Sequence, residues 1–153
     1  MPEYLETTVD KFILRVATDR LYSRDGIWLL AAECGGSRHV RVGLSDYVQQ
    51  RSGDAAFVHV KTPGTRLAPG DEFAELETIK ATLSLVSPLA AVIAEVNPAL
   101  ERSPERVNED PYGGGWLAVM QPTSWEADRA RLLDPDAYLL LMRSEAEEAL
   151  KDS

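Results

Sequence analysis

The stretch Phe73-Ala74-Glu75-Leu76-Glu77-Thr78-Ile79-Lys80-Ala81-Thr82-Leu83-Ser84-Leu85-Val86 holds two short apolar-rich runs, and Lys80 lies where they meet. Turn-forming residues at 68–71 precede the first run, and Ser87-Pro88 ends the second. The pattern predicts two strands joined by a tight turn, with Lys80 at its tip. Lysine is rare in this chain, and its ε-amine can be acylated where an arginine cannot. Lys80 is therefore the first candidate for a functional residue.

Short strands bounded by turns continue through most of the chain. They predict an all-β body, a small sandwich or barrel. One short internal helix is expected from Asp46 to Arg51, because Ser45 suits the N-cap position and Gly53 can close the helix. The region 97–115 is long, polar and rich in Pro, Asn, Asp and Gly, which is unusual for a loop in a compact domain. The last strand is expected at 116–121, with Trp116 buried at its start.

The hydrophobic period changes near the C-terminus, where two helices are expected. Thr123 and Glu126 have the spacing of a capping box before Ser124-Trp125. Asp134-Pro135 combines a good N-cap with a proline at the first helical position. The chain is thus predicted to be one domain, 1–153, with a core at 11–121 and C-terminal helices within 124–150. The polar arm at 3–10 is expected to become ordered only by docking.

Composition limits the classes of partner. The chain has 153 residues, a net charge of −9 and a pI of about 4.7. This charge disfavours binding to nucleic acid or to an anionic membrane, since both require clustered basic residues. No apolar run approaches a membrane span, and the first residues lack the basic start of a signal peptide. We therefore expect a cytoplasmic protein with protein partners and no membrane insertion.

Isolated reactive side chains offer little independent chemistry. Cys34 could exchange with a disulfide, but the acidic neighbour Glu33 should disfavour its thiolate. His39 and His59 have no second His or Cys at ligand spacing, so no metal site is expected. No catalytic constellation is visible, because phosphate-binding loops, nucleophile elbows and zinc motifs are all missing. The chain is therefore expected to be a non-enzymatic protein.

The segment Glu77-Thr78-Ile79-Lys80-Ala81 resembles the modification site of lipoyl carrier proteins, specifically the Glu-Ser-Val-Lys-Ala pattern of the glycine cleavage H-protein family. The resemblance runs from about Leu21 to Tyr138. Further blocks that carry it are Val42-Gly43-Leu44-Ser45-Asp46-Tyr47, Gly53-Asp54-Ala55-Ala56-Phe57-Val58, Gly70-Asp71, Val96-Asn97-Pro98-Ala99-Leu100-Glu101, Val107-Asn108-Glu109-Asp110-Pro111-Tyr112-Gly113, Gly115-Trp116-Leu117 and Leu132-Leu133-Asp134.

This resemblance implies a lipoyl-domain-like barrel-sandwich hybrid that carries lipoic acid covalently on Lys80. It also implies recognition by a lipoate ligase or lipoyl transferase, and dihydrolipoyl dehydrogenase as a further partner. Glu77 flanks the lysine, and it could serve recognition by the ligase or simply keep the tip soluble. The other residues that the resemblance assigns to ligase or partner recognition are Thr78, Ile79 and Ala81.

One departure from the family pattern bears on the group carried. The family usually reads His-Glu-Trp where this chain reads Gly26-Ile27-Trp28, so a cleft for the loaded arm would lose a polar pair. We interpret this variant, with the opening 4–10, as resembling the lipoate-binding proteins of sulfur oxidation, which serve a heterodisulfide-reductase-like complex. The alternatives are a carrier for the glycine cleavage enzymes and an unmodified scaffold with the same fold.

Overall fold

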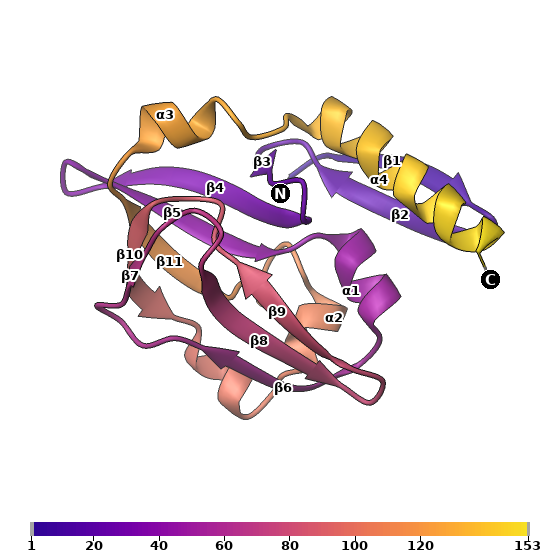
Figure 1. Ribbon diagram of the computed structural model, residues 1–153, viewed down its shortest axis with the longest axis horizontal. Helices are drawn as coiled ribbons and strands as arrows, with labels where there is room; N and C mark the ends of the chain where they lie inside the picture. The colour runs from indigo at the N-terminus through magenta and orange to yellow at the C-terminus, as the bar shows by residue number, and fades with distance from the viewer. Residues whose placement is uncertain (1, 153) are drawn as a thin grey trace.

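The computed structural model describes residues 2–152 and, of Cys34, the backbone alone. Most of the body is antiparallel β-sheet (Figure 1). A six-stranded sheet has the spatial order β3 (Leu21–Tyr22), β4 (Ile27–Cys34), β5 (Ser37–Leu44), β11 (Ala118–Pro122), β10 (Ala91–Val96), β7 (Arg66–Leu67). A three-stranded sheet has the order β6 (Ala55–Val60), β8 (Glu72–Thr78), β9 (Thr82–Val86). The prediction of a mostly β fold is confirmed.

The main hydrophobic core includes residues of both sheets. Phe73 and Leu76 from β8 and Leu85 from β9 belong to the same buried cluster as Val40 and Val42 from β5. Leu76 pairs with Leu83 across the β8–β9 ladder, while Glu75 and Glu77 alternate with it along β8 and point to the opposite face. The β8–β9 hairpin is thereby fixed to the body by one face, and its turn projects at the edge of the molecule (Figure 1).

Strand β4 is buried on both faces, which explains its continuous apolar sequence. Ile27 and Leu29 belong to the main core, whereas Trp28 belongs to a second cluster on the other side of the sheet. Gly43 lies opposite Trp28 in the β4–β5 register, and a Cβ there would come within 2.5 Å of the indole. A larger residue at this position would therefore displace the tryptophan.

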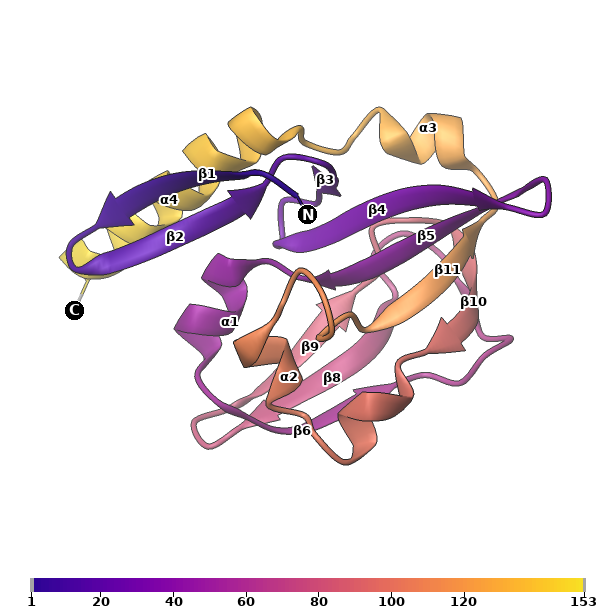
Figure 2. The same cartoon turned by 180° about the vertical axis from the view of Figure 1, so that it is seen from behind.

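The second cluster is covered by a two-stranded ribbon, β1 (Tyr4–Val9) and β2 (Phe12–Ala17), and by helix α4 (Pro135–Lys151) (Figures 1 and 2). Tyr22 and Tyr138 stack here with ring centroids 4.4 Å apart. The Tyr138 hydroxyl lies 2.7 Å from the Ser45 hydroxyl, so α4 is hydrogen-bonded to the residue that caps α1. This layer was not foreseen as a separate core.

Two predicted helix starts are confirmed. Ser45 accepts a hydrogen bond from Val48 N–H at the beginning of α1 (Asp46–Ser52), and Gly53 ends that helix with φ of +85°. Asp134 accepts from Ala137 N–H at the beginning of α4. Within residues 2–152, no helix is both long enough and apolar enough to cross a membrane.

The prediction for residues 3–10 is wrong. Tyr4–Val9 form strand β1, which pairs with β2 over its whole length. Thr7 and Val9 are buried, because alternate side chains of this polar segment point toward the second cluster. The isolated apolar residues of the arm are thus the inner face of a strand.

Two local predictions near the C-terminus also need correction. Helix α3 (Trp125–Arg129) exists, but its N-cap is Ser124 and not Thr123, and Ser124 makes no side-chain capping hydrogen bond, so the predicted capping box does not form. Strand β11 begins at Ala118, so Trp116 precedes it and is half-buried. The Arg41 guanidinium lies 4.7 Å from the centre of the Trp116 ring, and this contact takes the place of full burial.

The long polar region 97–115 contains two short helical turns, η1 (Pro98–Glu101) and α2 (Arg106–Glu109). Two asparagine side chains tie it to the body. Asn97 donates to the carbonyls of Gly114 and Trp116, and Asn108 donates to Gly53 and accepts from Ala55 N–H. These bonds satisfy backbone groups that regular pairing does not reach.

Candidate functional site

The turn between β8 and β9 places Lys80 as the sequence predicted. Thr78 N–H donates to the Ala81 carbonyl at 2.9 Å, so Ile79 and Lys80 are the two central residues of the turn. Neither has a positive φ, and the turn therefore needs no glycine. Both residues are exposed, Ile79 to 91%.

Thr78 has a structural role in this turn. Its hydroxyl oxygen accepts hydrogen bonds from the N–H groups of Lys80 at 3.3 Å and Ala81 at 3.2 Å. The same hydroxyl lies 3.2 Å from the Ala81 carbonyl, to which it can donate. A Ser or Thr side chain supplies such bonds to nearby backbone, and this accounts for the residue type before the turn.

The ammonium group of Lys80 is free of ion pairs with any residue in 2–152. Glu77 lies in β8 opposite Thr82 on one side and Phe57 on the other, and it is half-buried. The lysine therefore extends from an ordered turn into solvent, with a carboxylate and an aromatic ring behind it. This geometry suits a residue that must enter the active site of another enzyme.

The three residues of the sequence variant lie elsewhere. Gly26 directly precedes β4, and Ile27 and Trp28 are its first two residues, 1% and 0% exposed. The Trp28 indole N–H donates to the Pro111 carbonyl at 2.8 Å. In this structure the two side chains are covered by protein and do not line an open cleft. The predicted cleft variant is thus separated from the turn that carries Lys80 (Figure 1).

The one cysteine and the two histidines lie on three different strands. Cys34 ends β4 and pairs through its backbone with Ser37, while its side chain lies outside the described part of the structure. His39 lies on β5, and His59 on β6 stacks against Phe57 with ring centroids 6.0 Å apart. Among the described residues, no group of three or more His, Cys, Asp or Glu side chains could hold a metal ion.

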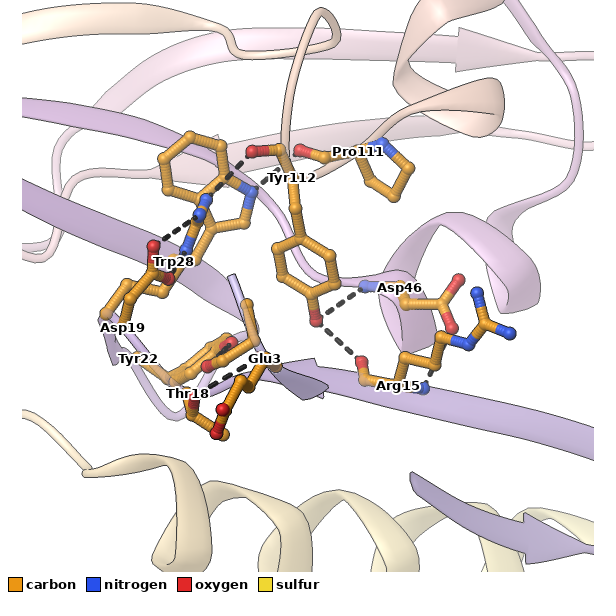
Figure 3. A network of polar contacts seen from close by, with 11 residues as sticks. Glu3, Arg15, Thr18, Asp19, Tyr22, Trp28, Asp46, Pro111 and Tyr112 are labelled. Atoms are coloured by element: carbon orange, nitrogen blue, oxygen red, sulfur yellow. Dashed lines mark hydrogen bonds and ion pairs between the residues drawn. The ribbon is translucent and has the colours of Figure 1, made fainter. Parts of the chain in front are cut away.

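Sequence reasoning missed the polar seam that joins the N-terminal ribbon to the body (Figure 3). The Tyr112 hydroxyl donates to the Arg15 carbonyl at 2.7 Å and accepts from Asp46 N–H. Arg20 is buried, donates to the Tyr112 carbonyl and lies over the Trp28 ring at 4.6 Å. The alternation of Leu5, Thr7 and Val9 was the one signal that could have indicated this strand.

Comparison with known proteins separates the N-terminal ribbon from the rest of the chain. The sequence profile described as "Glycine cleavage H-protein" matches residues 20–145. The matched region begins after β2, so the β1–β2 ribbon lies outside it.

Similar proteins include the probable glycine cleavage system H protein of Thermococcus kodakarensis, which is 39% identical over 123 residues, 80% of this chain and 89% of that protein. The H protein of Thermus thermophilus is 36% identical over 131 residues, 86% of this chain and 98% of its own length. The Bacteroides fragilis H protein is 45% identical over 97 residues, which are 63% of this chain and 76% of that protein.

The crystal structure of a glycine cleavage system H protein from Mycobacterium marinum has the same fold. The TM-score is 0.70 at 32% sequence identity, and the match covers 79% of this chain and 94% of that one. Sequence and structure agree, and the chain belongs to the glycine cleavage H-protein family.

Proposed function

We propose that this protein is a lipoyl carrier of the glycine cleavage system and that Lys80 is the attachment residue. The observation that carries the proposal is an exposed lysine without an ion pair to any described residue, central in an ordered turn, within Glu77-Thr78-Ile79-Lys80-Ala81. The family to which the chain belongs supports the same reading.

Attachment requires Lys80 to react as a nucleophile. Its ammonium loses a proton, and the amine attacks the activated carbonyl of a lipoyl donor. A C–N amide bond forms, and the bond from the carbonyl to the donor's leaving group breaks, with AMP leaving when the donor is lipoyl-adenylate. The exposed turn allows the four-carbon lysine stem to enter the pocket of a lipoate ligase or lipoyl transferase.

The protein itself holds the attachment point in place and delivers the lipoyl group to successive partner enzymes. When bound, the lipoyl group supplies a cyclic disulfide that accepts electrons and a transferred group. The rigid β8–β9 hairpin holds the attachment point while the long side chain moves, which raises the local concentration of the reactive end at successive partners. The partners proposed here are the glycine cleavage enzymes, with dihydrolipoyl dehydrogenase for reoxidation.

The comparisons favour glycine cleavage over the sulfur-transfer role that the variant at Gly26-Ile27-Trp28 suggested. Burial of Ile27 also weakens that suggestion, because a covered side chain does not reveal which group an arm carries. A heterodisulfide-reductase-like partner is therefore the second candidate, and the sulfur-uptake assay below tests it.

The attachment is tested by intact mass after incubation with lipoate, ATP and a lipoate–protein ligase. Wild type should gain one lipoyl group, and Lys80→Arg should gain none. Lys11→Arg is the matched control, since Lys11 also occupies the second central position of a two-residue hairpin turn. An adduct that persists in Lys80→Arg overturns the assignment, and wild type without an adduct supports the unmodified scaffold.

The role is tested with the lipoylated protein in two parallel assays. As acceptor for glycine decarboxylase it should support turnover comparable with that of a His-Glu-Trp relative. As acceptor of labelled sulfane sulfur from a persulfide donor it should take up none. Sulfur uptake without glycine turnover would replace this proposal by the sulfur-carrier reading.

A further inference from the structure

The outer face of the three-stranded sheet continues directly from the Lys80 turn. In the register, Phe57, Glu77 and Thr82 form one row across the three strands, and His59, Glu75 and Ser84 form the next. Leu76, on the opposite face, is buried in the core. The two rows therefore face solvent beside the turn.

Phe57 is a large apolar residue on this exposed face. Its side chain is 58% exposed, although it could have been buried by a shift of one residue. A β-bulge between Ala55 and Phe57 sets its direction and lies beside the turn. Phe57 is the cross-strand partner of Glu77, and Ile79 lies in the turn two residues after Glu77. Both present large apolar side chains to water, and apolar surface rimmed by polar groups typically marks an interaction site.

The charges on this face are unbalanced. Glu75 and Glu77 form no salt bridge with any residue in 2–152, and each lies in a row with an exposed aromatic side chain of β6, Glu77 with Phe57 and Glu75 with His59. Two unpaired carboxylates around an exposed ring are complementary to a partner with an apolar pocket and a basic rim.

The distance to which each enzyme must approach the Lys80 amine indicates which partner binds this surface. An enzyme that forms the amide must bring the Lys80 amine itself into its active site, so it must contact the sheet immediately behind the turn. Enzymes that act on the dithiolane meet the far end of a long arm and need no contact at that point. The surface nearest Lys80 thus belongs to the attaching enzyme.

We propose that Phe57, together with Glu75 and Glu77, forms the docking surface for the enzyme that attaches the lipoyl group. This rests on the proposed function of Lys80. Recognition then depends on side chains from two strands, and the linear motif 77–81 is insufficient by itself. Phe57 is the central apolar contact, and the two carboxylates set orientation and the rate of association.

The test measures kcat/KM for lipoylation by a lipoate–protein ligase with lipoate and ATP. Phe57→Ala should lower kcat/KM about tenfold or more, mainly through KM, as expected for loss of a central apolar contact. Phe12→Ala is the matched control, since Phe12 is 48% exposed near the other hairpin turn, and it should react like wild type. Phe57→Tyr should restore most of the rate. Equal rates for Phe57→Ala and Phe12→Ala would overturn the inference while leaving Lys80 as attachment residue.

The charge component is tested with Glu75→Gln/Glu77→Gln, which should lower kcat/KM and reduce its dependence on salt. Glu95→Gln is the control, because Glu95 is exposed on β10 and has no salt bridge with residues 2–152. An unchanged salt dependence in the double variant would overturn the assigned role of the carboxylates.

A last readout separates the attaching enzyme from other partners. Phe57→Ala, once driven to full lipoylation and reduced to the dithiol, should be reoxidised by dihydrolipoyl dehydrogenase with NAD⁺ as fast as wild type. An equal loss in both assays would show a general partner surface and overturn the commitment to the attaching enzyme. Wild type that is never lipoylated would overturn the proposed function, and this inference with it.

Discussion

The β1–β2 and β8–β9 hairpins have similar turns but are attached to the rest of the protein in different ways. Each has a two-residue turn with lysine second, Asp10-Lys11 in one and Ile79-Lys80 in the other. In the first, Asp10 has φ of +56°, whereas in the second the Thr78 hydroxyl holds the turn without any positive φ. Both tips lie toward the same end of the molecule, with α1 between them (Figure 1).

The attachments differ because β8 is the central strand of a sheet that contributes to the main core, whereas β1 and β2 form a two-stranded sheet that pairs with no other described strand. The ribbon instead depends on α4, α1 and the tyrosines of the second cluster. A lysine at a hairpin tip is therefore no signal by itself. What distinguishes Lys80 is the sequence around it and the exposed face of its own sheet.

Two phenylalanines give the largest expected contrast. Phe73→Ala, at the root of β8 and 0% exposed, should cost about 3–5 kcal/mol in the free energy of unfolding. Phe12→Ala, half-exposed on β2, should cost about 1 kcal/mol or less. Urea denaturation measures both. Similar losses would show that the ribbon is as firmly anchored as the β8–β9 hairpin.

Alkaline pH should weaken the second cluster. Burial raises the pKa of Tyr112 to about 12 and also raises the pKa of Tyr22 and Tyr138 well above the usual 10.0. These tyrosines stay neutral in the fold but ionise near pH 10 when unfolded, so their stabilisation is complete below pH 10 and declines above it. The free energy of unfolding should fall by roughly 1 kcal/mol per tyrosine over the first pH unit above 10.

Denaturant titrations on both sides of pH 10 measure this loss. Tyr138→Phe is the comparison variant, because it removes one ionising group and should make the decline shallower by about a third. The Tyr138–Ser45 hydrogen bond is lost as well, which lowers stability at all pH values but does not alter the slope. An identical slope in the variant would contradict the role of Tyr138.

The two turns predict small changes of opposite sign. Thr78→Val removes the acceptor of two backbone N–H groups and should cost about 1 kcal/mol. Asp10→Gly relieves a positive φ and should gain about 0.5 kcal/mol. Thermal unfolding resolves both shifts. A Thr78→Val protein with the melting temperature of wild type would mean that solvent satisfies those N–H groups equally well.

Local sequence chemistry predicted much of the fold. The caps at Ser45 and Asp134 were found because a capping side chain bonds to N–H groups only a few residues away. Segment 3–10 was missed because its burial depends on α4, more than a hundred residues later. Trp116 was expected in the core, yet its ring lies under Arg41, a contact that no local pattern contains.

In the candidate site too, the features set by near neighbours could be predicted and those set by distant segments could not. Lys80 and its turn could be predicted, because strand alternation and turn chemistry act between near neighbours. The groups that cover Trp28 could not, since Pro111 and Tyr112 follow it by 83 residues or more in the chain. Phe57 was not singled out, because its position beside Glu77 arises only when β6 pairs with β8.

The sequence by itself determined the family, the hairpin and the lysine at its tip, since these follow from residue order and short-range backbone preferences. The tertiary structure alone decided which side chains accompany that lysine. Strand pairing brings Phe57 and Glu75 to the surface behind the turn, and packing of α4 on β1 creates a second core. Long-range pairing and packing depend on contacts between distant segments, and a linear pattern does not show which distant segments will meet.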